Sequence, residues 1–252
     1  MNALTFAFAT KRVLLVGAGG LGSPAGTLLA RAGVGGIDVL DDDSVELSNL
    51  QRQTLYDETH VGQSKAQSAV MQLQRAAQAA GHAGARMNAR EERLTPENAL
   101  ALVREFDLVV EGSDNYATKF LTADACAIAR IPCVQAAAVR WVGWALGTWP
   151  GQSACLRCVF EDIPEGPDRG CATAGVIGPV VGVLGAVQAA IALRMLSNTD
   201  TAVRAAGVLH HYRALPGALR QSRVTRSPTC PTCNGEITQL DRARYMPRVC
   251  AA

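Results

Sequence analysis

Three adjacent aspartates and a later arginine stand close together in the segment VLDDDSVELSNLQRQ, residues 39–53. An acidic residue that ends an apolar run is typical of a position that binds the ribose of a nucleotide. The earlier hexapeptide GAGGLG has the spacing G-x-G-x-x-G, and its glycines permit a tight turn in which backbone amides approach phosphate. Together the two segments predict a nucleotide site. Its ribose is expected at Asp41, and its phosphates at Gly17, Gly19, Gly20 and Gly22.

Further residues, most of them polar or cationic, follow the same acids. They are Ser48, Asn49, Leu50, Gln51, Arg52 and, at the start of a later helical stretch, Lys65. Two cations beside a nucleotide suit triphosphate chemistry, because fixed positive charge stabilises a phosphorus centre on which negative charge develops. Either cation taken alone is also explained as an ordinary exposed charge at a helix end. The glycine motif by itself fits an NAD-dependent Rossmann oxidoreductase equally well, and that function remains the alternative.

A further carboxylate follows another apolar run, in the segment DLVVEGSDN. Ligands of open α/β sheets bind beyond the carboxyl ends of the strands, where Asp114 and its neighbour Asn115 are expected to lie. Mg²⁺ is usually held by one or two carboxylates together with substrate oxygens, so Asp114 is a predicted magnesium ligand. The same two residues can also cap a helix that begins near Tyr116, and the two roles are compatible.

The chain contains eight cysteines, four of which form two CxxC pairs. Each pair can place two thiolates on one metal ion, and two pairs complete a tetrahedral, structural zinc site. A redox CxxC is the alternative, but neither pair opens a helix in the β-α-β context that such motifs require. The predicted zinc ligands are Cys155, Cys158, Cys230 and Cys233.

Cys171 stands apart from these pairs, in the segment DRGCATAG. A thiol beside an arginine and near a helix N-terminus can have a lowered pKa, so a reactive thiolate is one expectation. A passive loop cysteine is the other.

Apolar periodicity predicts alternating strands and helices along the first half of the chain. This order is typical of a Rossmann-like, doubly wound and mostly parallel α/β sheet, which tryptophans after residue 140 continue as antiparallel strands. We expect a single domain over residues 1–252, with a nucleotide-binding half at 1–138 and a second, zinc-binding half at 139–252. The expected strands cover residues 13–16, 37–40, 86–88, 107–111 and 132–136, and the expected helices cover 23–32, 65–80, 96–104, capped by Thr95, and 116–130.

Composition limits the classes of partner. The 252 residues are 48% hydrophobic and carry a net charge of only +2, which favours neither nucleic acid nor an anionic membrane as a partner. The first residues lack the features of a signal peptide, so a cytoplasmic protein is expected. The uncharged segment at 172–193 is long enough to cross a bilayer, but Pro179, Gln188 and several glycines interrupt it. We therefore expect a buried helix there, at a core or subunit interface.

The order of these motifs resembles one known family. The motifs are GAGGLGS, LDDD, SNLQRQ, VGQSK, SDN, ACLRC, RGCATAGVIGPVVGVLGAVQA and CPTC. From about residue 12 to 235 the chain is similar to the bacterial ThiF- and MoeB-type adenylyltransferases, E1-like enzymes that activate ubiquitin-like sulfur carrier proteins in thiamine and molybdopterin biosynthesis.

The resemblance implies a homodimer in which each subunit binds MgATP and the Gly-Gly C-terminus of a carrier protein. The terminal carboxylate attacks the α-phosphate and yields an acyl-adenylate and pyrophosphate. By resemblance, Asn49, Arg52 and Lys65 face the triphosphate, Gly20 the phosphates, Asp41 the ribose and Asp114 the magnesium ion. Asp43 shapes the same site, whereas Asp42 is expected to point away from it. The matching cysteine of the thiamine-type relatives, at Cys171, forms a covalent acyl link with the carrier.

One departure from the family pattern concerns the N-terminus. Relatives usually begin with an arm whose arginine reaches the ATP of the neighbouring subunit, but none of the eleven residues before Arg12 is an arginine. Either the start is truncated, or Lys11 or another cation replaces this arginine, or adenylation is weaker. A non-catalytic relative that binds a carrier is a further alternative. Sulfur would come from a separate donor protein, a cysteine desulfurase or sulfurtransferase.

Overall fold

The computed structural model describes residues 8–164, 175–197 and 202–245. Its described strands form one eight-stranded sheet in the order β3-β2-β1-β4-β5-β6-β7-β8. The first five are β1 (Arg12–Val16), β2 (Gly36–Leu40), β3 (Arg86–Arg90), β4 (Leu108–Glu111) and β5 (Cys133–Val139). The other three are β6 (Val142–Thr148), β7 (Val208–Arg213) and β8 (Ala218–Arg223).

The sheet changes direction at β5. Strands β1 to β5 pair in parallel, and β6, β7 and β8 pair antiparallel from the edge of β5 onward. The order of the parallel strands reverses between β1 and β4, which is the position where open α/β sheets bind ligands. The predicted fold class, a parallel sheet continued by an antiparallel part, is therefore confirmed.

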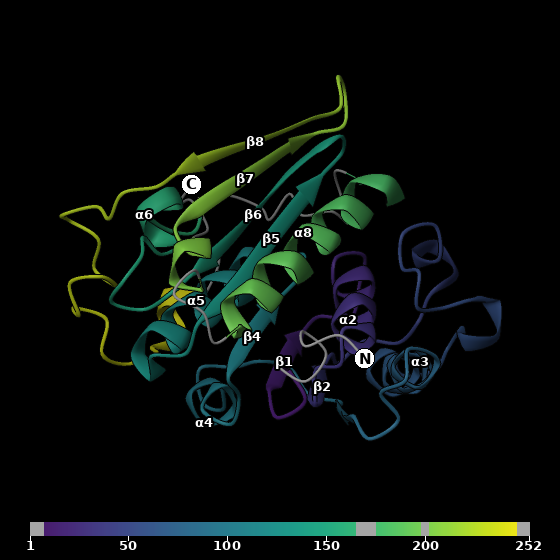
Figure 1. Ribbon diagram of the computed structural model, residues 1–252. Coiled ribbons are helices and arrows are strands. Elements are labelled where there is room, and N and C mark those ends of the chain that lie inside the picture. The colour runs from purple at the N-terminus through teal and green to yellow at the C-terminus, as the bar shows by residue number, and fades with distance from the viewer. Residues whose placement is uncertain (1–7, 165–174, 198–201, 246–252) are drawn as a thin grey trace.

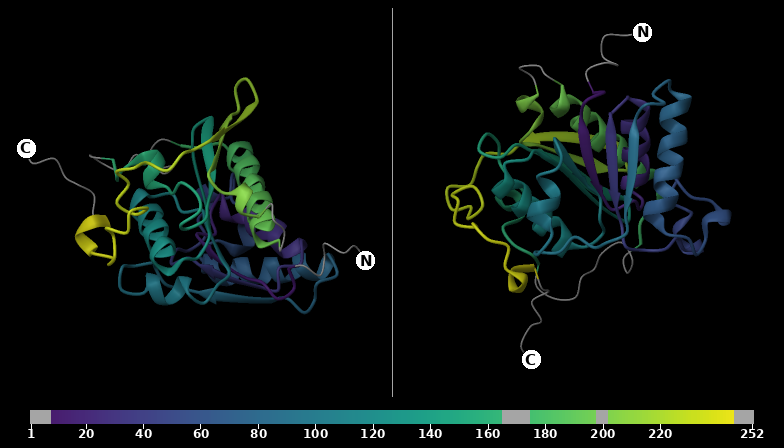
Figure 2. Two further views of the ribbon diagram at one scale, coloured as in Figure 1. Left: turned by 60° about the vertical axis from the view of Figure 1, so that its left-hand side comes forward. Right: turned by 90° about the horizontal axis from the view of Figure 1, so that it is seen from below.

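Helices cover both faces of the sheet, and the sheet separates two hydrophobic cores. On one face lie α2 (Gly22–Arg31), α3 (Lys65–Ala79) and α8 (Gly178–Leu196), with α8 packed across β5 and β6 (Figure 1). On the other lie α4 (Ala99–Val103) and α5 (Tyr116–Ala129), and Figure 2, left, shows α5 and α8 on opposite sides of β5 and β6. The short elements are α6 (Arg157–Phe160), η1 (Leu47–Asn49), η2 (Glu58–His60), η3 (Val203–Ala205) and η4 (Arg242–Tyr245).

Helix α8 corresponds to the uncharged segment of the sequence. It is long and apolar enough to cross a membrane by length and composition alone, but 56% of its most apolar window is buried within the fold. Its only polar core residue, Gln188, is fully buried and donates hydrogen bonds to the carbonyl oxygens of Glu111 and Val134. The helix therefore belongs to the core of the fold, as expected.

Two details of the predicted elements are wrong. The helix expected at 96–104 begins at Ala99, and Thr95 does not cap it. Instead the amide of Thr95 donates to Oδ1 of Asn98 at 2.8 Å, since an asparagine side chain competes with helical hydrogen bonds and stabilises a turn. Among the tryptophans expected in strands, only Trp144 lies within β6.

The contact of α8 with α2 depends on Gly185. A Cβ atom there would lie 2.6 Å from the carbonyl oxygen of Leu21 and would overlap Pro24. We expect Gly185→Ala to lower the free energy of unfolding by roughly 1–3 kcal/mol, the usual cost of overpacking a core. Gly182, one turn earlier, has no atom within 4 Å of an added Cβ. Gly182→Ala is therefore the control and should stabilise the helix by about 0.5–1 kcal/mol. Urea unfolding of both variants measures the contrast, and equal midpoints would contradict the close packing.

Candidate functional site

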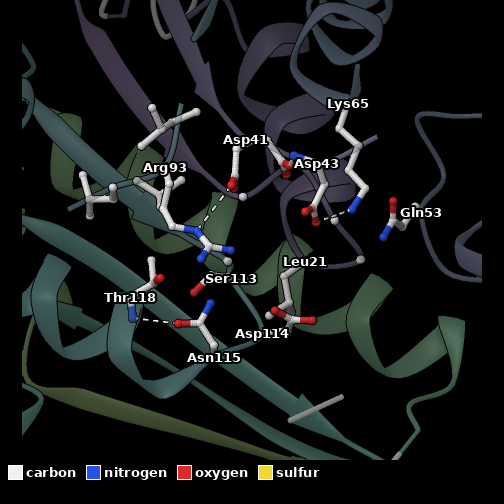
Figure 3. A pocket seen from close by; sticks show the side chains of 18 of the residues that line it. Leu21, Asp41, Asp43, Gln53, Lys65, Arg93, Ser113, Asp114, Asn115 and Thr118 are labelled. Atoms are coloured by element: carbon white, nitrogen blue, oxygen red, sulfur yellow. Dashed lines mark hydrogen bonds and ion pairs between the residues drawn. The ribbon is translucent and has the colours of Figure 1, made fainter. Parts of the chain in front are cut away.

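A cavity lies beyond the carboxyl ends of β1, β2 and β4, where the strand order reverses (Figure 3). It contains most of the residues that the sequence predicts for a nucleotide site. Those residues are Gly17, Gly19, Gly20, Asp41, Asp43, Arg52, Lys65, Asp114 and Asn115. The cavity thus joins side chains from segments that are far apart in the sequence.

The glycine loop forms the floor of this cavity. Gly17 has a φ of +85°, a left-handed conformation that favours glycine, and a Cβ on it would lie 3.0 Å from the amide nitrogen of Ser113. Helix α2 begins at Gly22, where a Cβ would overlap the carbonyl oxygen of Gly17. The loop can therefore turn tightly into α2, and the N-terminus of a helix is a favourable place for phosphate.

Asp41 is fixed beside the glycine loop. Its carboxylate accepts hydrogen bonds from the amides of Ala18 at 2.8 Å and Asp43 at 3.0 Å. Burial raises the pKa of Asp41, while the hydrogen bond from Ala18 and the charge of Lys65 act in the opposite direction. A carboxylate has about four acceptor sites, so two bonds leave room for the hydroxyl groups of a ribose.

Lys65 extends from the start of α3 into the cavity with only 8% of its side chain exposed. Its Nζ lies 2.8 Å from Oδ2 of Asp43, whose side chain is 62% exposed. Asp43 thereby orients the ammonium group. Tyr56 anchors the backbone below, because its buried hydroxyl donates to the carbonyl oxygen of Ala18 at 3.0 Å and lies 3.1 Å from that of Lys65.

Two arginines border the open side of the cavity. Nη1 of Arg52 donates to the carbonyl oxygen of Ser48 at 3.3 Å. Arg93 was not predicted; its side chain is 70% exposed, and its Nε lies 3.3 Å from Oδ2 of Asp42. Asp42 also lines the cavity, so the expectation that it points away is wrong. Side chains alternate between the two faces of a sheet only within a strand, and β2 ends at Leu40. The alternation therefore does not predict the direction of Asp42.

Five predicted residues do not line the cavity. Asn49 is buried and donates to Oγ of Ser48, while Nε2 of Gln51 donates to the carbonyl oxygen of Val176 at 3.4 Å. Leu50 packs against the hydrophobic core. These contacts hold the loop that carries Arg52. The five residues are Gly22, Ser48, Asn49, Leu50 and Gln51.

Of the two roles expected of Asp114 and Asn115, the helix cap is made by Asn115. Oδ1 of Asn115 accepts a hydrogen bond from the amide of Thr118 at 2.8 Å and caps α5. Asp114 is exposed at the cavity, and within the described ranges its carboxylate has no hydrogen-bond partner. Its oxygens are therefore available to a cation.

A buried ion pair supports the turn that bears Asp114. Glu111 is fully buried at the end of β4, and its carboxylate accepts from the amide of Ser113 at 2.7 Å and from Nζ of Lys119 at 3.0 Å. Nζ of Lys119 also donates to the carbonyl oxygen of Ala136. Gln135 donates to the carbonyl oxygen of Lys119 at 2.8 Å. The network fixes the position of the Ser113–Asn115 turn between β4 and α5.

A second cavity, of about 270 Å³, lies on the other side of this turn. It shares Ser113, Asp114 and Asn115 with the first cavity, but most of its lining is apolar. Trp144 and Phe160 form one wall, with ring centroids 4.9 Å apart. The two cavities therefore meet at one turn, one of them rich in charge and the other apolar.

The four cysteines of the CxxC pairs come together although they are distant in sequence. Their sulfur atoms all lie within 4.8 Å of one another. Sγ of Cys155 is 3.4 Å from that of Cys230, and Sγ of Cys158 is 3.5 Å from that of Cys233. Four thiolates around tetrahedral Zn²⁺ are separated by about 3.8 Å, so the cluster can hold such an ion. Cys171 lies outside the described residues.

Comparison with known proteins identifies similar chains. A sequence model of the ThiF family matches residues 6–232. The chain is 40% identical over 239 residues to the sulfur carrier protein adenylyltransferase of Thermus thermophilus, covering 92% of this chain and 86% of that relative. It is 39% identical over 225 residues to the sulfur carrier protein ThiS adenylyltransferase of Escherichia coli, covering 89% and 86%.

Longer relatives and more distant structures also match. The chain is 39% identical over 242 residues to the adenylyltransferase and sulfurtransferase MOCS3 of Sus scrofa. The match covers 94% of this chain but only 51% of that protein. Among solved structures, E. coli MccB matches with a TM-score of 0.78 at 21% identity, covering 91% of this chain and 67% of MccB. At this identity the likeness supports the fold alone.

The network around Glu111 can be tested by removing its cation. Lys119→Met leaves a fully buried carboxylate uncompensated, and we expect a loss of about 3–5 kcal/mol in the free energy of unfolding. Lys11→Met is the matched control, because Lys11 pairs with Asp107 at 3.7 Å in a half-exposed setting. Lys11→Met should lower the free energy of unfolding by only about 0–1 kcal/mol. Denaturant unfolding measures both, and similar losses would show that burial does not strengthen the pair.

Proposed function

The chain belongs to the ThiF family, and from this premise we propose that it uses ATP to adenylate the C-terminal carboxylate of a ubiquitin-like sulfur carrier protein. The observation that carries the proposal is the meeting of two cavities at the Ser113–Asn115 turn. The charged cavity suits a triphosphate, and the apolar cavity suits an extended peptide. A reaction between the two ligands would take place where the cavities join.

In the charged cavity, ATP would bind with its ribose at Asp41 and its phosphates over the start of α2. Arg52 and Lys65 line the same space, and Arg93 adds a third cation on the open side. Asp114 would hold the Mg²⁺ ion that accompanies ATP. Such an ion neutralises charge on the phosphate oxygens.

The reaction needs little covalent chemistry from the protein. The carrier carboxylate attacks the α-phosphorus, the bond from that phosphorus to its bridging oxygen breaks, and pyrophosphate leaves with the electron pair. Negative charge builds on the phosphate oxygens as this happens, and fixed cations stabilise that charge most where water is excluded. Arg52 and Lys65 would supply this stabilisation, with Asp43 keeping the Lys65 ammonium in place.

The apolar cavity would receive the tail of the carrier. Its walls come from β5, β6, α5 and α6, and His211 on β7 stands at its edge. A Gly-Gly terminus carries no side chains and could therefore lie close against the rings of Trp144 and Phe160. The terminal carboxylate would then reach the turn that both cavities share.

Further partners follow from the same proposal. We propose that Zn²⁺ binds the four clustered cysteines and has a structural role, because four thiolates leave no open position. We also propose a cytoplasmic homodimer that receives sulfur from a separate donor protein. Lys11 lies at the amino end of β1, where it pairs with Asp107, and thus far from the cavity of its own chain.

The alternative of an NAD-dependent oxidoreductase is not favoured. Hydride transfer has no use for Arg52, Lys65 and Asp114 in one cavity, and the closely similar relatives are named adenylyltransferases. A carrier-binding relative without catalysis would differ in its activity alone, so only an assay separates it from an enzyme.

Pyrophosphate exchange tests the proposal directly. With a Gly-Gly-tailed carrier the chain should incorporate labelled pyrophosphate into ATP. Arg52→Ala and Asp114→Ala should each lower the exchange rate by ~2 orders of magnitude or more, since Arg52 would stabilise the charge that develops in the transition state and Asp114 would hold the magnesium ion that does the same. Arg75→Ala removes an exposed cation of α3 outside the cavity and is the control. Retained exchange in Asp114→Ala would remove the magnesium assignment. Carrier binding without exchange in excess MgATP would identify the non-catalytic relative.

Cys171 can be separated from adenylation. We expect Cys171→Ala to retain pyrophosphate exchange and to lose any thiol-dependent step that follows, because a thiolate can form a covalent acyl link only after the carboxylate is activated. Mass spectrometry of the enzyme after incubation with carrier and ATP detects the adduct. An adduct of equal yield in Cys171→Ala would contradict this role.

A further inference from the structure

Asp124 is a fully buried carboxylate on α5 that does not line the nucleotide cavity. A buried carboxylate is costly unless hydrogen bonds or a cation compensate its charge. Asp124 has both: among the residues that the structure describes, its side-chain partners are Arg157, Thr232 and Tyr245, all from the C-terminal part of the chain that contains the CxxC pairs.

The first partner lies inside the first CxxC pair. Arg157 stands between Cys155 and Cys158, and its guanidinium donates to Asp124 from Nε at 3.1 Å and from Nη2 at 3.0 Å. Only 2% of the Arg157 side chain is exposed. Paired hydrogen bonds between a guanidinium and a carboxylate fix geometry as well as charge. The backbone between the two cysteines is therefore tied to α5.

The second partner lies inside the second CxxC pair. Thr232 stands between Cys230 and Cys233, and its hydroxyl donates to Oδ1 of Asp124 at 2.9 Å. The hydroxyl of Tyr245, on η4, donates to Oδ2 at 3.0 Å. One carboxylate thus contacts a residue from the interior of each CxxC pair, although the pairs are far apart in the sequence.

The first CxxC pair also borders the apolar cavity. Leu156, beside Arg157, and Phe160 at the end of α6 both line it. The Arg157 guanidinium lies 4.8 Å over the ring of Phe120, which lines the cavity as well. A shift of α6 would therefore move the wall of that cavity.

We propose that Asp124 is a positioning residue that holds both CxxC pairs in register for one metal ion and, through α6, fixes the wall of the apolar cavity. Residues outside the ligand set orient metal ligands, and their loss typically lowers metal affinity 10–100-fold. Asp124 meets this description from the side of α5, the helix that also carries Lys119.

Zinc release tests the first part of the proposal. Asp124→Asn keeps the size of the side chain but removes the charge that pairs with Arg157. The zinc-loaded variant should release zinc to a chromogenic chelator about 10–100-fold faster than the unchanged chain. Asp38→Asn is the matched control: Asp38 is also buried and pairs with Arg90 at 2.9 Å, but within β2. It is expected to reduce stability without accelerating zinc release.

A conservative pair of variants separates positioning from general loss of structure. Thr232→Ser keeps the hydroxyl that bonds to Asp124, whereas Thr232→Val keeps the shape and removes it. Zinc release should be faster in Thr232→Val and unchanged in Thr232→Ser. The absorption spectrum of the Co²⁺-substituted protein, which reports thiolate geometry, should change in Asp124→Asn and not in Asp38→Asn.

The second part rests on the proposed function. Asp124→Asn, assayed at saturating zinc, should raise KM for the carrier several-fold and leave kcat within about twofold, because the tail site moves while the nucleotide cavity does not. Zinc release equal to that of Asp38→Asn overturns the positioning role, whatever the function. Faster release with an unchanged KM overturns the link to the cavity. A chain without any exchange activity contradicts the proposed function and leaves the zinc measurement decisive.

Discussion

The carboxylate of Glu111 has no contact with solvent, and its charge must be compensated entirely by protein groups. Lys119 supplies the cation from α5, and Ser113 supplies an amide and a hydroxyl from the turn that follows β4. The backbone carbonyl oxygen of Glu111 itself accepts a hydrogen bond from Gln188 on α8, at 2.8 Å. Two helices on opposite faces and the central strand thus meet at one residue. Because an unpaired buried charge would be costly, these contacts strongly favour one relative arrangement of the three elements.

Helix α5 transmits this arrangement toward the cysteine cluster. It carries Lys119, which pairs with Glu111 below the Ser113–Asn115 turn, and, five residues later, Asp124, which faces the cysteine cluster. Five residues of a helix correspond to about 7.5 Å, so both buried pairs act on one short, rigid segment. The cap at Asn115 fixes the start of the same helix beside Asp114. The position of the predicted magnesium ligand and that of the two CxxC loops therefore depend on a common element.

Much of this organisation follows from the sequence, because periodicity reveals strands and the glycine loop has a fixed place before a helix. The rule that ligands bind beyond the carboxyl ends of the strands was sufficient to predict that Asp41 and Asp114 line one cavity. Applied to β3, it would also have found Arg93, which follows that strand. The roles of Asn49 and Gln51 could not be predicted, since polar residues in a loop can face a ligand or hold the loop. Nor does spacing reveal that Asp124 joins the CxxC pairs, because the sequence gives no sign of contacts between α5 and residues more than a hundred positions later.

The division between the two cavities has a chemical consequence for an adenylating enzyme. An acyl-adenylate is a reactive anhydride, and water that reaches it competes with the next acceptor. In this fold the turn at Ser113–Asn115 separates a charged cavity from one bordered by Trp144, Phe160 and Phe120. An occupied tail site would place apolar walls around the acyl group, while the cations remain on the phosphate side. The wall formed by α6 is held by Arg157, and Arg157 by Asp124, so protection of the intermediate would depend on a contact made at the cysteine cluster.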